Sequence, residues 1–440
     1  MENPTSSHER KVARIATQLR EYTGDRPVSL KKKAVSHEVP KLNDKRHDDT
    51  KIDISDLCEI LHIDPEQRIC IAEPGVTFVD LVAATMQHGL VPIVVPELKT
   101  ITIGGAVAGC SIESMSYVYG GFHDTCLEYE VITANGAVLT CTPTNEHALV
   151  FQMAHGTFGT LGVISKLTFR LIPCKPFVKV TYEKFDDLES YKAAIMARYE
   201  ARDVDFMDGI IHSPTEFVLS LGNFVDEAPY THSYDWMRVY YVSTRTRKED
   251  YLRTSDYFFR YDKGVTHVTP SSFLGRLFLG KFVNSTRVLQ LAKLLRRVLP
   301  ERAIPVTLDT FIPFSKMTEF FAWYKREVDF FPLWCVPYKR VRTYEWIDAE
   351  FVKKAPDDLY LDIAIYGLRR SDGKNYYAMF ERELMQIGGL KTLITPNFYS
   401  EEDFWKVWNR PNYEAVKRIT DPNNIFRDLY EKTCRATRGL

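Results

Sequence analysis

A run of small residues between Ile101 and Gly109 is the part of this sequence best suited to hold a ligand. From Gly104 to Gly109 every residue except Val107 is glycine or alanine. A backbone without large side chains can approach a ligand closely, and its amide N–H groups stay uncovered. The spacing is GGxxxG with no Gly-Lys-Ser/Thr after it, so it is neither a P-loop nor a dinucleotide fingerprint. Taken alone, such a loop can equally be structural.

Two further segments favour the ligand-binding interpretation. Gly156–Gly162 contains three glycines and leads directly into an alternating apolar run from Val163 to Leu171, which predicts a strand. Tyr119-Gly120 precedes another expected strand, and that strand ends at an Asn135-Gly136 turn. The sequence therefore predicts several glycine-containing turns, each joined to a strand, that together could surround one ligand.

Periodic patterns around these segments predict the elements that hold them in place. The apolar residues within 77–88 recur with helical spacing, with Thr77 as the N-cap and Gly89 as the end of the helix. Asn135-Gly136 is the strongest hairpin signal and joins residues 129–134 to residues 137–142. We expect a solvated helix over the first 20 residues, a helix over 145–153, and strands over 51–54, 59–63 and 68–73.

Composition narrows the class of protein. The chain has 440 residues, enough for two or three domains with a normal core. Lys and Arg number 57 against 58 Asp and Glu, so the global charge gives no reason to expect a nucleic-acid partner. The eight cysteines form no CxxC and the 11 histidines form no HExxH, so we expect reduced thiols and no metal.

The character of the chain changes near Lys175, where Pro173 and Pro176 interrupt the pattern. Aromatic-rich strands and helices follow from about residue 178 to residue 395, and a helical C-terminus begins near Glu401. Short strands mixed with helices predict an α+β architecture and not a doubly wound parallel sheet.

Four segments in a fixed order resemble the FAD-binding domain of the vanillyl-alcohol-oxidase/PCMH flavoprotein superfamily. They are Glu73–Thr77, Ile103-Gly104-Gly105, Tyr119-Gly120 and Gly159–Ile164. Further segments resemble the Δ24-sterol reductase branch of that superfamily, and the resemblance runs from about Val28 to Arg438. These segments are Val95–Leu98, Gly109 with Ile112–Ser114, Cys141–Pro143, Phe331–Trp334, Tyr360–Ile363 with Tyr366-Gly367, and Phe404-Trp405.

The resemblance implies a two-part PCMH-type FAD-binding domain over residues 1–177 and an α+β substrate cap over residues 178–395. Residues 396–440 would then pack back toward the flavin. Neither His37 nor Cys110 stands in a complete attachment motif, so we expect non-covalent FAD. Carried over residue by residue, the FAD contacts expected from the resemblance are Pro96, Thr102, Ile103, Gly104, Gly105, Ala106, Gly109, Ser111, Ile112, Glu113, Tyr119, Gly159, Gly162, Val163 and Ile164.

The sequence departs from the superfamily where a glycine-rich loop usually holds the FAD diphosphate. Here the chain reads Leu30-Lys-Lys-Lys-Ala-Val-Ser-His37. Lys31 and Lys33 could neutralise the diphosphate, with Ser36 and His37 in the same loop. The alternative is a solvated basic turn.

The resemblance implies reduction of a C=C bond of a sterol or isoprenoid lipid, with NADPH as reductant. An isolated alkene needs a proton donor in an apolar pocket. Candidates are Tyr366 and Tyr399, with Asp362 orienting them; Asp362, Ala364 and Tyr366 share one face of an expected strand. Each tyrosine could instead be a core residue with a bonded hydroxyl. Two other functions remain open: an FAD oxidase or dehydrogenase acting on an alcohol, and a flavin-binding protein without catalysis.

Residues 273–300 combine apolar and basic side chains without acids, a pattern that could lie on an anionic membrane or form a cap helix with one solvated face. The N-terminal residues lack the apolar centre of a signal peptide, and no stretch is long and apolar enough to span a bilayer. We therefore expect a cytoplasmic protein or one peripheral to an intracellular membrane. No feature of the sequence indicates an oligomeric state.

Overall fold

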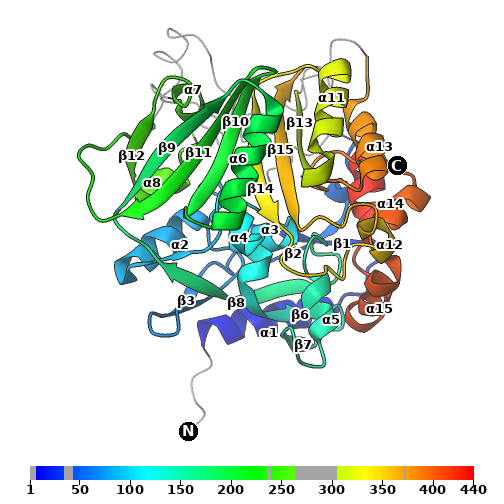
Figure 1. The fold of residues 1–440 in the computed structure, drawn as a ribbon. Coiled ribbons are helices and arrows are strands. Elements are labelled where there is room, and N and C mark those ends of the chain that lie inside the picture. The colour runs from blue at the N-terminus through cyan, green and yellow to red at the C-terminus, as the bar shows by residue number, and fades with distance from the viewer. Residues whose placement is uncertain (1–5, 34–42, 235–238, 263–304, 370–372) are drawn as a thin grey trace.

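The computed structural model describes residues 6–33, 43–234, 239–262, 305–369 and 373–440. Two large sheets lie one above the other in Figure 1, with helices at the outer faces and along one side. Pairing within both large sheets is antiparallel, which agrees with the predicted mixture of helices and antiparallel strands. Ser36, His37 and the basic stretch 273–300 lie outside the described residues.

The smaller of the two large sheets comes from the N-terminal half of the chain. Its strand order is β3-β4-β8-β6-β7, with β5 paired to β8. The Asn135-Gly136 turn joins β6 to β7 as predicted, with Gly136 at a φ of 76° that favours glycine. The strands are β3 (Ile60–Asp64), β4 (Ile69–Ala72), β5 (Leu90–Pro92), β6 (Cys126–Ile132), β7 (Val138–Cys141) and β8 (Val163–Pro173).

The larger sheet has eight strands and is built from residues after 176. Its order is β12-β9-β11-β10-β14-β15-β13-β16. A separate parallel pair, β1 (Val28–Lys31) and β2 (Thr50–Asp53), lies near the chain's ends in space. The eight strands are β9 (Phe177–Phe185), β10 (Phe206–Ser213), β11 (Glu216–Val225), β12 (Glu249–Arg253), β13 (Val306–Pro313), β14 (Leu333–Lys339), β15 (Leu359–Leu368) and β16 (Leu390–Lys391).

The helices begin at clear sequence signals. Thr77 caps α2 by accepting from the Asp80 amide, as its position predicted, and Gly89 follows in the left-handed region. The described helices are α1 (Ser7–Arg20), α2 (Phe78–Thr85), α3 (Ile103–Ala108), α4 (Ser116–Tyr119), α5 (Ala148–Met153), α6 (Leu188–Ala201), α7 (Tyr240–Ser243), α8 (Thr254–Phe258), α11 (Met317–Glu327), α12 (Ala349–Val352), α13 (Tyr376–Ile387), α14 (Glu401–Val407) and α15 (Arg410–Thr420).

The eight-stranded sheet has two differently packed faces. Trp334, Val336 and Ala364 share a core with Ile103 and Val107 of α3, so this face is turned toward the N-terminal half. The alternate residues of β14 and β15 pack with α6, α11 and α13 on the other face. A side chain on the first face of β14 or β15 therefore points toward the small-residue segment.

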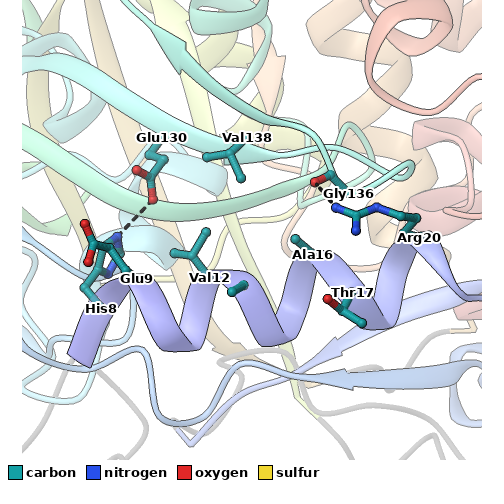
Figure 2. Close-up of a pocket in the computed structure, with 10 residues that line it drawn as sticks. His8, Glu9, Val12, Ala16, Thr17, Arg20, Glu130, Gly136 and Val138 are labelled. Atoms are coloured by element: carbon teal, nitrogen blue, oxygen red, sulfur yellow. Dashed lines mark hydrogen bonds and ion pairs between the residues drawn. The ribbon is translucent and has the colours of Figure 1, made fainter. Parts of the chain in front are cut away.

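Helix α1 differs from the solvated helix that the sequence predicts. Its residues Val12, Ile15 and Leu19 are buried, because α1 packs beneath the six-stranded sheet on the side away from the larger sheet. A groove of about 440 Å³ remains between α1 and the β6–β7 hairpin (Figure 2). At one end of α1, His8 contacts both Glu73 and Glu130 at 2.9 Å.

The His8 contacts predict a pH dependence of stability. Hydrogen bonds with Glu130 and Glu73 raise the pKa of His8 to about 9, against an ordinary value of 6.5. The folded state therefore binds the proton more tightly than the unfolded state does. This contribution, about 1–3 kcal/mol, is fully present below pH 6.5 and is lost as pH rises through 9. Urea unfolding of the parent and of His8→Gln at pH 6 and pH 10 checks it: the difference in unfolding free energy should shrink at pH 10.

Candidate functional site

The small-residue segment folds as a short helix, α3, and its first amides are not free. Thr102 caps the helix, and its Oγ1 accepts from the Gly105 amide at 3.3 Å. The Ile103 amide donates to the Val76 carbonyl at 3.0 Å and the Gly104 amide to the Pro74 carbonyl at 2.9 Å. The expectation of uncovered amides here was wrong, because the turn before α2 brings two carbonyls against the helix N-terminus. Because these amides are already bonded, a ligand could use this segment only by packing closely against its backbone.

Gly104 and Gly105 of α3 differ in what surrounds them. A Cβ on Gly104 would lie 2.5 Å from the Pro74 Cβ, so glycine is required there by the protein's own packing. A Cβ on Gly105 would meet only Thr102 Oγ1, at 3.2 Å. Among the described residues, the protein's own packing therefore does not require glycine at position 105, and the backbone there stays open to close approach.

The second glycine segment is fixed by lysines from the C-terminal part of the chain. Gly159 has a φ of 69°, a conformation that favours glycine. On either side of it, the Phe158 carbonyl accepts from Lys432 Nζ at 2.7 Å and the Thr160 carbonyl accepts from Lys417 Nζ at 3.0 Å. The C-terminal segment thus contacts the N-terminal half of the chain at this loop.

The other residues that the sequence predicts as FAD contacts differ in charge and in burial. Glu113 carries a carboxylate. This carboxylate forms an ion pair with buried Arg260 at 3.0 Å, so its charge is already paired within the protein. Lys31 pairs with Asp53 at 2.7 Å and its side chain is 63% exposed. Pro96, Ala106, Gly162 and Val163 are buried, whereas Gly109, Ser111, Ile112, Tyr119 and Ile164 are half-buried and Lys33 is exposed.

A tyrosine and an aspartate form a close pair on the sheet face that is turned toward α3. Strand register places Asp309 of β13 opposite Ala364 of β15, between the neighbours Asp362 and Tyr366. The Tyr366 hydroxyl donates to Asp309 Oδ1 at 2.5 Å. We expected Asp362 in that orienting role. Asp362 Oδ1, by contrast, is a buried oxygen with no hydrogen-bond partner in the part of the chain that the structure describes.

Glu97 adds a third carboxyl group to this face. Burial, together with the nearby charge of Asp309, raises the pKa of Glu97 to about 8. Burial raises the pKa of Asp309 to about 6, and burial together with the Asp309 charge raises the pKa of Asp362 well above its usual range. Carboxyl groups that repel one another in an apolar setting keep protons near neutral pH. We call Glu97, Asp309, Asp362 and Tyr366 the acidic cluster; it can hold a proton and donate it.

Tyr399 is not part of the acidic cluster. Its ring packs against Trp408 and Phe404 at centroid distances of 5.4 and 6.2 Å. Burial raises the pKa of Tyr399, and the charge contributing to that increase comes from Glu381. Of the two tyrosines predicted from the sequence, Tyr366 is therefore the one that the fold brings together with Asp362.

Comparisons with known proteins indicate the class to which this chain is similar. Residues 29–142 match a family described as "FAD binding domain". The human Delta(24)-sterol reductase is 26% identical over 98% of this chain and 87% of its own length, and that of Arabidopsis thaliana is 23% identical over 88% and 77%. The chain is therefore similar over nearly its whole length to Δ24-sterol reductases, and its residues 29–142 match the FAD-binding family. A Mycolicibacterium smegmatis decaprenylphosphoryl-beta-D-ribose oxidase is 32% identical over only 28% of this chain.

The match to the FAD-binding family covers only part of the candidate site. The match to the FAD-binding family contains α3 and Glu97 and ends at residue 142, before Gly159. Asp309 and Glu97 were missed by sequence reasoning. A signal existed for Asp309, since one acid interrupts the alternating apolar residues of 306–313. Within the described ranges no three His, Cys, Asp or Glu side chains form a metal site, and no helix is long and apolar enough to cross a membrane.

Proposed function

We propose that this protein is an FAD-dependent reductase that saturates a C=C bond of a sterol or isoprenoid lipid, with NADPH as reductant. The observation that carries the proposal is the Tyr366–Asp309 pair on the sheet face turned toward α3. The whole-length similarity to Delta(24)-sterol reductases supports the substrate class. A lipid substrate also suits a site whose walls are largely aromatic and aliphatic.

We propose that residues 1–177 are a two-part FAD-binding domain, that residues 178–395 are the substrate cap, and that residues 396–440 return to the flavin. The step from β8 to β9 supports the boundary, because the two strands belong to different sheets. The bonds from Lys417 and Lys432 to the Gly159 loop support the return of the C-terminal segment.

The residues present fit FAD, since a Cβ added to Gly105 would meet only Thr102 Oγ1 among the described residues and the backbone there is open to close approach. When bound, FAD supplies the hydride. The chain would supply the proton: Tyr366 would give its hydroxyl proton to one alkene carbon as positive charge develops on the other, and a proton held by Asp309 would pass to the Tyr366 oxygen across their 2.5 Å hydrogen bond. The aromatic side chains beside the cluster, Phe311 and Trp334, would stabilise that positive charge. The other residues of the sheet face exclude water.

The second candidate is an FAD-dependent oxidase or dehydrogenase acting on an alcohol, which the partial similarity to the ribose oxidase favours. One anaerobic experiment separates the two. Purified protein with bound FAD is mixed with NADPH or with an alcohol, and the visible absorption of oxidised flavin is followed. Bleaching by NADPH supports the reductase, and bleaching by the alcohol alone supports the oxidase. Bound FAD that neither reagent bleaches indicates a flavin-binding protein without catalysis.

A further inference from the structure

Three distant segments of the chain converge beside the Gly159 loop. The end of β1 arrives there, because a Cβ on Gly159 would lie 3.4 Å from Leu30 Cδ1. Lys51 of β2 donates to Ser29 Oγ of β1 at 2.5 Å. The helical turn Glu431–Arg435 places Lys432 Nζ on the Phe158 carbonyl at 2.7 Å. Each of the three segments contributes lysine to the same small region.

Positive charge predominates in this region. The charged groups acting on Lys432 are Arg46, Lys32 and Lys51, with Asp49 as the one acid among its main influences in the described residues. Burial, together with the nearby cations, lowers the pKa of Lys432 to about 7. Burial also lowers the pKa of Lys51, and Arg46 contributes in the same direction.

The acids of these segments are already engaged with arginine or with Lys31. Asp44 pairs with Arg46 at 2.6 Å, and Asp49 pairs with Arg427 at 2.8 Å. On Lys432's own helical turn, Glu431 pairs with Arg427 and Arg435. By contrast, Lys51 donates to Ser29 Oγ and to the Arg46 carbonyl, and Lys432 donates to the Phe158 carbonyl. Those three acceptors are uncharged, so neither lysine forms an ion pair within the described residues, and Asp49 is the one acid near both of them.

We propose that Lys432 and Lys51, together with Lys32, form the binding site for the diphosphate of FAD beside Gly159. The proposal rests on the FAD-binding function proposed above. The sequence alone predicted that the lysine-rich loop at residues 30–37 neutralises the diphosphate, and the proposal gives part of that role to the C-terminal segment. Lys432 already has one donor on the Phe158 carbonyl and keeps two for phosphate oxygens. A diphosphate stabilises the charged form of Lys432, so Lys432 takes up a proton when FAD binds near pH 8.

Titration of deflavinated protein with FAD, followed by flavin fluorescence between pH 6.5 and 8.5, tests the site. In the parent protein FAD affinity should fall as pH rises above 7, by up to about tenfold per pH unit. Lys432→Arg, whose charge does not titrate, should bind FAD with little pH dependence. Lys432→Met should bind at least about tenfold more weakly at pH 6.5. Lys353→Met, which removes an exposed lysine paired with Glu350, should behave as the parent does.

Riboflavin, which lacks phosphates, is the second probe. Its affinity should be equal in the parent and in both Lys432 variants. If Lys432→Met and the parent bind FAD equally, or if the pH dependence persists unchanged in Lys432→Arg, the diphosphate site is wrong while the FAD function stands. If the parent itself binds neither FAD nor riboflavin, the proposed function is wrong. Thermal melting of each variant confirms that a weaker FAD affinity comes from a folded protein.

Discussion

Gly105→Val protein should purify folded but without yellow colour. A Cβ at this position meets only Thr102 Oγ1, at 3.2 Å, so the protein's own packing tolerates it with a small adjustment. The added methyl groups then occupy the space beside α3 that we assign to FAD. Overpacking of this kind typically costs about 1–3 kcal/mol, which corresponds to roughly 5–150-fold weaker binding. FAD content per chain, measured by absorbance after purification, checks the result.

Two other glycines provide controls for the Gly105 substitution. Gly104→Ala would place a Cβ 2.5 Å from the Pro74 Cβ, so this variant should lose stability. Gly89 has a φ of 68° and nothing within 4 Å of an added Cβ, so Gly89→Ala should cost about 1 kcal/mol of stability and keep its FAD. Stoichiometric FAD in Gly105→Val would show that α3 does not approach the cofactor.

Tyr366→Phe and Asp309→Asn should each lose alkene reduction while NADPH still bleaches the flavin. Phenylalanine keeps the ring and removes only the donor, and asparagine removes the carboxyl that holds the donor at 2.5 Å. Loss of a general acid typically costs about 10²–10⁴-fold in rate. Anaerobic stopped-flow measurement of the two half-reactions distinguishes this loss from a general loss of activity, because only the oxidative half-reaction needs the proton.

The matched control is another buried tyrosine–aspartate pair, whose aspartate lies on β10 of the same sheet. The Tyr261 hydroxyl donates to Asp208 Oδ2 at 2.7 Å, and Asp208 also accepts from Trp334 Nε1 at 3.0 Å. Tyr261→Phe should lower stability by about 1–3 kcal/mol and leave both half-reactions intact in the folded fraction. If Tyr366→Phe and Asp309→Asn turn over near the parent rate, the proton comes from another group.

Local signals in the sequence predicted local structure well. The Thr77 cap, the Asn135-Gly136 hairpin and the shared face of Asp362, Ala364 and Tyr366 all depend on neighbouring residues, and the structure confirms the cap and the hairpin. The burial of α1 depends instead on packing beneath a sheet whose strands are far away in sequence. Amphipathic spacing in α1 could have indicated it.

The parts of the site that sequence reasoning missed depend on long-range pairing. Asp309 reaches Tyr366 only through the register of β13 against β15, which no local pattern fixes. The carbonyls of Pro74 and Val76 engage the α3 amides across a turn some 30 residues earlier in the chain. Lys432 comes to the Gly159 loop from the far end of the chain. Pattern and propensity report neighbours along the sequence, whereas these contacts are set by the packing of distant segments.

The central claim is that reduced flavin on this protein passes its hydride to an alkene. The direct measurement is a single turnover without oxygen. Protein whose FAD has been reduced by one equivalent of NADPH is mixed with a sterol carrying a trisubstituted side-chain double bond. The account predicts that the oxidised flavin spectrum returns and that one equivalent of the saturated sterol appears per flavin. A flavin that stays reduced, with the alkene recovered unchanged from both sterol and isoprenoid substrates, would contradict it.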